Sequence, residues 1–171
     1  MRAVGLFQPS SREAETALIN LDIPEPEPGP RDLKVAVHAV SINPADTSFR
    51  RNFTPTPGQP RVLSYDAAGT VVAVGSDVFL FKPGDDVFYA GDMTRQGSSA
   101  EYQLVDERIA ALKPKTLSFV ETAARPLTSI TAWELLFDRL GVGYGSKTTP
   151  GVLLIINGAG GVGSMLTQLA R

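Results

Sequence analysis

A run of glycines near the end of the chain constrains the fold more strongly than any other feature of its 171 residues. An apolar and partly β-branched segment, 152–156, leads almost directly into Gly158-Ala-Gly-Gly-Val-Gly163, and a second apolar stretch with helical spacing follows. The order is strand, glycine turn and helix, with the helix starting close to the end of the strand. The sequence therefore predicts a βα unit, with a strand at 152–156 and a helix after the turn.

Each glycine of this turn has its own purpose in such a unit. Gly158 permits a tight turn, Gly160 lets the backbone approach a pyrophosphate, and Gly163 lets the helix pack close to the strand. The helix N-terminus adds unpaired N–H groups and a positive dipole end. The pattern indicates the start of a Rossmann dinucleotide-binding domain. Because the residue that reads the ribose 2′ position lies about 20 residues further on, we expect the chain to be part of a longer enzyme.

Composition narrows the classes of partner. The net charge of −2 argues against nucleic acid and against an anionic membrane surface, since both select basic faces. No segment reaches the ~18 apolar residues of a membrane span, and the first residues lack a signal-peptide pattern. The absence of cysteine rules out disulfides and thiolate metal ligands. These features together fit a reducing, cytoplasmic compartment.

The first hundred or so residues have the pattern of an antiparallel β domain. Short strand-like segments alternate with Pro- and Gly-rich breakers. The candidate strands are 2–7, 17–23, 34–41, 67–74, 86–90 and 101–105. Several short strands at this spacing favour a closed or nearly closed barrel.

The hydrophobic period changes near Ser118. Ser118 and Glu121 form a capping-box pattern that opens a short helix, which Pro126 limits. Apolar side chains then recur at helical spacing and predict a helix with a buried face. They are Ile130, Trp133, Leu136, Phe137 and Leu140.

A metal site is not expected in this segment. Catalytic zinc usually takes three protein ligands from Cys, His, Asp and Glu, and the chain has no Cys and a single His. That residue, His38, lies on the more polar face of an alternating strand, which suggests a solvated or locally bonded side chain. Asp85 and Asp86 follow Pro-Gly and resemble turn residues.

Three segments carry polar side chains that could be functional. Asn-Pro within 41–50 is a turn signal, and Asp46 could cap a short helix there. The small residues of 64–69 suggest close packing. Thr128, Ser129 and Thr131 could cap the long helix or hydrogen-bond a ligand at its mouth. Spacing alone leaves the structural and the functional interpretation open.

Taken together, these segments resemble the medium-chain dehydrogenase/reductase superfamily along the whole chain, and most of all its zinc-type alcohol-dehydrogenase-like, quinone-oxidoreductase-related branch. The resemblance is carried, in order, by segments 40–50, 64–78, 81–92, 100–119, 125–140 and 156–163. It implies a mostly β GroES-like barrel at 1–126, followed at 127–171 by the beginning of an α/β Rossmann domain, α+β overall. The active site would lie in the cleft between the two.

The resemblance also implies that the zinc machinery has been replaced. Zinc-dependent members place a Cys ligand where this sequence has Asn43, followed by His where it has Pro44. They carry Gly-His-Glu where it has Ser64-Tyr65-Asp66. Their four-cysteine structural lobe has no counterpart between Asp92 and Ala100.

In zinc-free quinone oxidoreductases, the position of Asn43 hydrogen-bonds near the nicotinamide ribose. By the same resemblance, Thr131 would line the nicotinamide pocket, and Gly160, Gly161 and Val162 would contact the pyrophosphate and ribose. Together with Gly158 and Gly163 these form the expected cofactor site. Many relatives have Tyr where this chain has Ser48.

The expected function follows from these implied roles. Without zinc as a Lewis acid, an enone or quinone is a better hydride acceptor than a plain ketone, because its conjugation delocalises the developing charge. We expect a zinc-independent, NADPH-dependent reductase (NADH remaining open), with Asn43, Ser48 and Tyr65 as candidate catalytic residues. The whole protein is expected to be a homodimer. The alternatives are a non-catalytic GroES-like binding or scaffold module, which would not need the glycine loop, and a zinc-type alcohol dehydrogenase.

Overall fold

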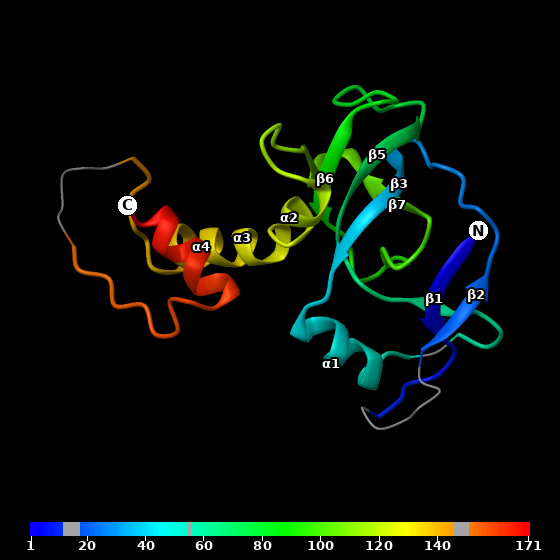
Figure 1. Ribbon diagram of the computed structural model, residues 1–171, viewed down its shortest axis with the longest axis horizontal. Helices are drawn as coiled ribbons and strands as arrows, with labels where there is room; N and C mark the ends of the chain where they lie inside the picture. The colour runs from blue at the N-terminus through cyan, green and yellow to red at the C-terminus, as the bar shows by residue number, and fades with distance from the viewer. Residues whose placement is uncertain (12–17, 55, 146–150) are drawn as a thin grey trace. The chain divides into compact units, whose positions relative to one another are not determined.

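The computed structural model describes residues 1–11, 18–54, 56–145 and 151–171. The chain divides into two compact units, Met1–Ala124 and Arg125–Arg171 (Figure 1). The first unit holds all the described β-strands, and the second is helical.

The first unit contains two antiparallel sheets. One has the order β2-β1-β4 and the other β7-β3-β5-β6-β8. The strands are β1 (Arg2–Leu6), β2 (Ile19–Asp22), β3 (Asp32–Ser41), β4 (Arg61–Val62), β5 (Asp66–Val74), β6 (Asp86–Ala90), β7 (Tyr102–Asp106) and β8 (Ala110–Leu112). A 3-10 turn, η1 (Glu107–Ile109), joins the last two. The predicted strands therefore form within a few residues of the expected bounds, although Ala17 of the segment 17–23 lies outside the described residues.

The core of this unit lies on one face of the larger sheet. It consists of alternate residues of the central strands, because successive side chains of a strand point to opposite faces. The buried cluster is Leu33, Val35, Ala67, Val71, Val87, Tyr89 and Val105. At Gly69 the sheet leaves no room for a side chain, since a Cβ there would lie 2.2 Å from the carbonyl oxygen of Ala36.

The expected closed barrel is not formed among the described strands. The two sheets remain separate and are linked by a single bridge between Ala3 and Ala100, with a 2.8 Å bond from the N–H of Val4 to the carbonyl of Ser99. Strand β4 is only two residues long and pairs with β1 alone. Closure needs continuous ladders at every edge, and these short edge strands do not supply them.

Two helices belong to the first unit. α1 (Pro44–Asn52) follows β3 directly, and α2 (Phe119–Ala123) opens at the predicted capping box. There the N–H of Ser118 donates to the Glu121 carboxylate at 2.8 Å, and the N–H of Glu121 donates to the Ser118 hydroxyl at 3.2 Å.

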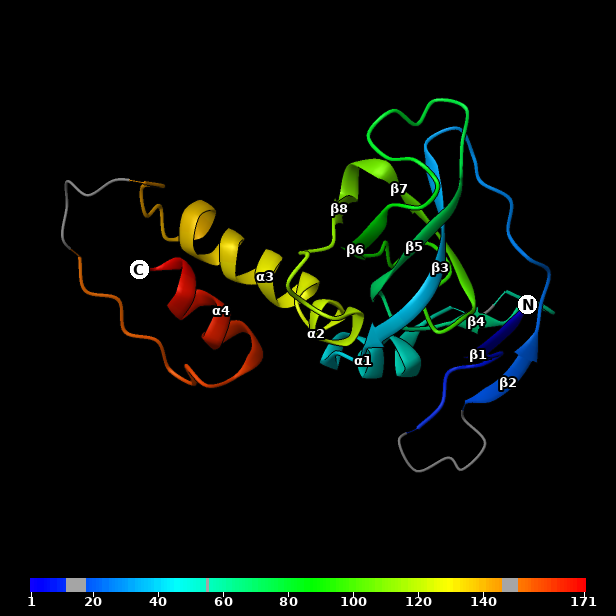
Figure 2. The ribbon, with the colours of Figure 1, turned by 45° about the horizontal axis from the view of Figure 1, so that its top comes forward.

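The second unit packs two helical segments against each other. α3 (Pro126–Trp133) continues as a π-helix, η2 (Glu134–Arg139), and α4 (Gly161–Leu169) lies alongside α3 in both views (Figure 2). Ala132, Leu136 and Leu166 form their shared core. The predicted buried face is only partly buried, because Ile130, Trp133 and Leu140 are 47%, 42% and 53% exposed.

The segment 151–156 is not a strand in this structure, contrary to expectation. Val152 and Ile156 are almost fully exposed, while Ile155 packs against the α3–α4 core. A strand of a parallel sheet exists only by pairing with neighbouring strands, and no described strand pairs with this segment. The described residues of this unit therefore hold no strand with which the apolar segment could pair.

Candidate functional site

Asn43 lies at the end of β3, immediately before α1, and its side chain is bonded to a buried carboxylate. Its Nδ2 donates to Oδ2 of Asp66 at 3.0 Å. Asp66 is 1% exposed and begins β5, which is paired with β3 at this point by the register Ser41–Asp66. The pairing of the two central strands therefore brings Asn43, where the resemblance has a cysteine ligand, to the segment Ser64-Tyr65-Asp66, where it has Gly-His-Glu.

Asp46 fixes the backbone around this pair. One carboxylate oxygen accepts from the N–H of Asn43 at 2.7 Å, and the other accepts from the N–H of Ser64 at 2.9 Å. The side chain is 5% exposed, and burial raises the pKa of its carboxyl, against the opposing effect of these N–H donors. Asp46 is the N3 residue of α1 and bonds back to its N-cap, Asn43, which is the capping role that the sequence had left open. It also ties α1 to the segment that leads into β5.

Tyr65 is buried between an arginine and a phenylalanine. Its hydroxyl oxygen accepts from Nη2 of Arg61 at 3.3 Å, and its ring meets that of Phe49 edge-on, with centroids 6.1 Å apart. Because the oxygen accepts this bond, the phenolic hydrogen points away from Arg61 and remains available to another acceptor. Arg61 was not among the predicted site residues, and its only signal in the sequence is its spacing of four residues from Tyr65.

Ser48 lies on the exposed side of α1, and its backbone carbonyl accepts from Nδ2 of Asn52 at 2.9 Å. Its hydroxyl makes no contact with Asn43 or Tyr65 among the hydrogen bonds of the described residues. Of the three candidate catalytic residues, Asn43 thus bonds to Asp66 and Tyr65 to Arg61, while Ser48 has no described bond to either of them.

In the glycine turn of the second unit, the tight turn is made by a different residue from the one expected. The residue with positive φ is Asn157, at 61°, and Gly158 has an ordinary backbone conformation. Asparagine tolerates this region better than most residues, so the signal was present in the sequence. A Cβ at Gly158 would meet its nearest neighbour only at 3.8 Å, so the assigned need for glycine there is not supported by space.

Gly163 does require the absence of a side chain. A Cβ there would lie 2.2 Å from the carbonyl oxygen of Asn157 and 2.8 Å from Cα of Gly158. At Gly160, the N-cap of α4, a Cβ would meet the flexible side chain of Asn157 at 2.7 Å. The first turn of α4 thus packs directly on the preceding backbone, with its N–H groups at the turn.

The hydroxyls of α3 are bonded within their own helix. Thr131 is exposed, and its Oγ1 donates to the carbonyl of Leu127 at 2.7 Å, while that of Thr128 donates to the carbonyl of Arg125 at 3.0 Å. A Cβ on Gly161 would lie 3.0 Å from the methyl group of Thr128, so the start of α4 lies against α3. Val162 is partly buried against the helical core.

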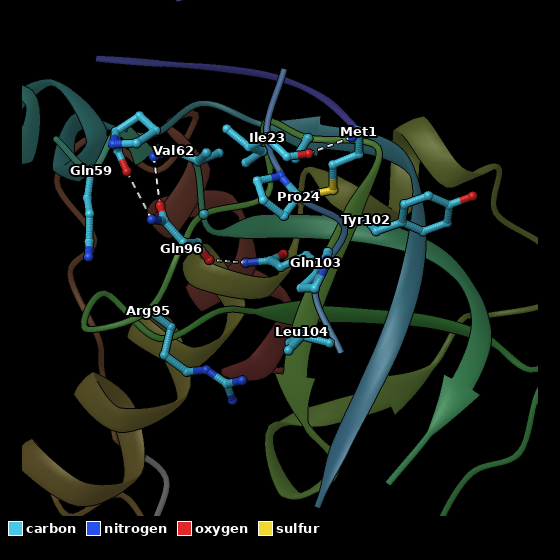
Figure 3. Close-up of a pocket in the computed structure, with 14 residues that line it drawn as sticks. Met1, Ile23, Pro24, Gln59, Val62, Arg95, Gln96, Tyr102, Gln103 and Leu104 are labelled. Atoms are coloured by element: carbon cyan, nitrogen blue, oxygen red, sulfur yellow. Dashed lines mark hydrogen bonds between the residues drawn. The ribbon is translucent and has the colours of Figure 1, made fainter. Parts of the chain in front are cut away.

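A separate pocket of about 360 Å³ lies in the first unit, and none of the predicted site residues lines it (Figure 3). Most of its polar groups are already hydrogen-bonded to other groups of the protein. Both ends of the Gln96 carboxamide are bonded to backbone, at 2.8 and 3.0 Å. Gln103 donates to the Gln96 carbonyl, its Oε1 being buried without a described partner, and Arg95 forms two bonds to Asp32. This pocket offers little to orient a reacting molecule.

Two features absent from the described residues bear on other classes of function. No group of three or more His, Asp or Glu side chains is arranged to hold a metal ion in that part of the chain. None of the helices described is both long and apolar enough to cross a membrane.

The chain belongs to the family of alcohol dehydrogenase GroES-like domains, whose family model matches residues 29–115. Its relatives place it in the medium-chain dehydrogenase/reductase superfamily, as the N-terminal portion of that fold. These relatives are named as oxidoreductases or as alcohol dehydrogenase-like proteins.

Two relatives illustrate the range of names. A zinc-type alcohol dehydrogenase-like protein of Staphylococcus aureus is 45% identical over 172 residues, which cover 100% of this chain and 51% of that protein. A 2-methylene-furan-3-one reductase of Solanum lycopersicum is 42% identical over 150 residues, covering 80% of this chain and 36% of the reductase.

Solved structures agree with this placement. A Rhizobium etli protein, named as a candidate zinc-dependent alcohol dehydrogenase, is 52% identical with a TM-score of 0.92, covering 100% of this chain and 50% of its own. A Pseudomonas syringae quinone oxidoreductase is 30% identical with a TM-score of 0.79 (99% and 49%). A mycobacterial protein in complex with NADPH is 30% identical with a TM-score of 0.80 (98% and 49%). The chain therefore spans about half the length of these relatives.

Proposed function

We propose that this chain is the N-terminal part of a zinc-independent, NADPH-dependent reductase of quinones or α,β-unsaturated carbonyl compounds. The observation that carries the proposal is the bond between Asn43 and the buried Asp66. Asn43 stands where the resemblance has a cysteine ligand, and Asp66 belongs to the segment where it has Gly-His-Glu; here the two side chains bond to each other. An amide and a carboxylate that satisfy one another do not present the converging lone pairs that zinc requires.

The names of two relatives refer to zinc, whereas the residues of this chain favour zinc-free chemistry. The sequence has no cysteine and one histidine. That histidine, His38, contacts Thr70 through Nε2 at 3.1 Å and lies beside the ring of Phe119, with centroids 4.5 Å apart. It is therefore occupied away from Asn43 and Asp66.

The glycine turn is proposed to bind a dinucleotide. The close packing of Gly163 on the backbone of Asn157 sets the start of α4 against the turn, and at Gly160 a side chain would meet that of Asn157. Gly158, Gly161 and Val162 complete the proposed cofactor-binding segment, with Thr131 proposed at the nicotinamide. A nicotinamide cofactor bound there would supply the hydride. NADPH is proposed because a structural relative was solved in complex with it. NADH stays the alternative, since another structural relative is named as NAD-dependent.

The residues of the first unit would orient the carbonyl substrate and supply a proton. Asn43, held by Asp66, is proposed to position the reacting end of the cofactor. The Tyr65 hydroxyl, whose oxygen already accepts from Arg61, is proposed to donate its hydrogen to the carbonyl oxygen of the substrate. Ser48, exposed on α1, is the second candidate donor. The whole protein is proposed to be a cytoplasmic homodimer.

Zinc content tests this proposal. We expect the whole protein, purified without added metal, to contain no stoichiometric zinc and to keep its reductase activity in excess chelator, because the Asn43 and Asp66 positions are bonded to each other. Elemental analysis and steady-state rates before and after chelation provide the measurement. One zinc per chain, with activity lost on its removal and restored by zinc, would overturn the proposal.

A further inference from the structure

Arg61 is a half-buried cation at a pocket of about 350 Å³ in the first unit, separate from the glycine turn. The other lining residues are aromatic or neutral and polar, and Arg61 is the only charged residue among those described. They include Phe49, Asn52, Phe53, Thr56, Gln59 and Gln96. The volume falls within the usual range for sites that bind small molecules.

The guanidinium of Arg61 is held rigidly without being neutralised. It lies over the ring of Phe49, 4.9 Å from the centroid, and its Nη2 donates to the hydroxyl of Tyr65 and to the carbonyl of Met93. All three partners are uncharged. No carboxylate in the described part of the chain lies within ion-pair distance of it, and Nε is buried there without a partner.

The charge of Arg61 is felt by a neighbouring acid that is itself occupied. The pKa of Asp92 is held below its ordinary value, mainly by the N–H and hydroxyl of Thr94, with smaller contributions from the charges of Arg95 and Arg61. Asp92 accepts both Thr94 bonds through Oδ1 at 2.7 Å, and among the described residues it forms no ion pair with the guanidinium.

A fixed, uncompensated guanidinium beside aromatic rings has a clear chemical preference. A guanidinium has five N–H groups, one on Nε and two on each terminal nitrogen. Only those on Nη2 have described bonds, which leaves Nη1 and the buried Nε without one. A carboxylate matches the fork of such a group and forms charge-assisted bonds with it, while Phe49 and Phe53 give the pocket an aromatic wall that suits an apolar ring.

We propose that this pocket binds a small organic anion, a carboxylate carried on an aromatic or unsaturated ring. The proposal concerns binding at Arg61 and does not depend on the hydride transfer proposed above, so either can fail without the other.

Benzoate and benzamide form a matched pair of probes, because they share size and ring and differ in charge. Nuclear magnetic resonance titration of the 171-residue chain should show saturable benzoate shifts at amides of residues 49–61 and at Gln96. Benzamide should bind at least about tenfold more weakly, the factor expected for one charge-assisted bond. Equal binding of the two probes, or shifts confined to other surfaces, would overturn the proposal.

Variants locate the site. Arg61→Gln should weaken benzoate binding about tenfold or more, whereas Arg108→Gln, at an exposed arginine paired with Asp106, should leave it unchanged. If Arg61→Gln fails to fold, Thr56→Trp decides the matter, because Thr56 is exposed and lines the pocket, which a large side chain there would fill. Unchanged benzoate affinity in a folded Thr56→Trp variant would contradict the assigned site.

Discussion

The buried carboxylate of Asp46 joins two parts of the backbone that are distant in sequence. It accepts from the N–H groups of Asn43 and Ser64, and neither donor has another described partner. The site around Asn43 therefore depends on a residue that does not itself take part in the proposed chemistry.

Replacing Asp46 with Asn should lower the free energy of unfolding by about 1–3 kcal/mol, because an amide NH₂ must then face one of the two N–H donors. Chemical denaturation of the chain would measure the change. Asp77→Asn is the matched control, since Asp77 is exposed and its bond from the hydroxyl of Ser76 survives the substitution. Equal stability of the two variants would show that the Asp46 bonds contribute nothing.

The single residue Asp32 makes a pH-dependent contribution to the stability of the fold. Two bonds from Arg95 and one from the N–H of Gly29 hold the pKa of Asp32 below its ordinary value of 3.8. A carboxyl with a depressed pKa in the fold stabilises the protein above its unfolded pKa and loses that effect as pH falls. The stability difference between the wild type and Asp32→Asn should thus be constant above about pH 5 and shrink below pH 3.8. Thermal unfolding across this range would detect it, and a difference that grew on acidification would contradict the assignment.

At the scale of elements, the two end glycines of the motif, Gly158 and Gly163, differ in how much space surrounds them. Gly163→Ala should destabilise the second unit by more than about 1 kcal/mol, because its Cβ would overlap the backbone of Asn157. Gly158→Ala should be nearly neutral, since the nearest atom to its Cβ lies at 3.8 Å. Amide hydrogen exchange of α4 in both variants is the measurement, and the reverse order of protection would refute the described turn.

Local patterns predicted individual elements better than their assembly. The capping box at Ser118 and the alternation that became β3 and β5 depend on neighbours within a few residues, so the sequence alone defines them. The open arrangement of the two sheets depends on pairing between short edge strands such as β4. No periodicity exists in two residues, and so the barrel was predicted more closed than it is.

For the candidate site, the resemblance predicted which residues matter but not which side chains they contact. Asn43 and Tyr65 were identified by position, but their partners, Asp66 and Arg61, emerged only when β3 and β5 were paired and Arg61 was placed over Phe49. Ser48 was chosen for its place in a motif. It lies on the exposed side of α1 because of the way that helix is turned about its axis, which the motif does not specify.

At the scale of the whole molecule, the chain consists of a GroES-like unit and a second unit that carries the glycine turn. Relatives of about twice the length share both. The exposed apolar side chains of Val152, Leu154 and Ile156 agree with the proposal that this segment belongs to a larger sheet in the whole protein.

The most direct test of the central claim compares two ketones of nearly identical size with the whole protein, in chelator. Methyl vinyl ketone is conjugated and ethyl methyl ketone is its saturated counterpart. Because a zinc-free site depends on the substrate to delocalise charge, NADPH oxidation should be rapid with the enone and scarcely detectable with the saturated ketone. Equal rates for both ketones, or a rate with either that vanishes on removal of zinc, would contradict the account.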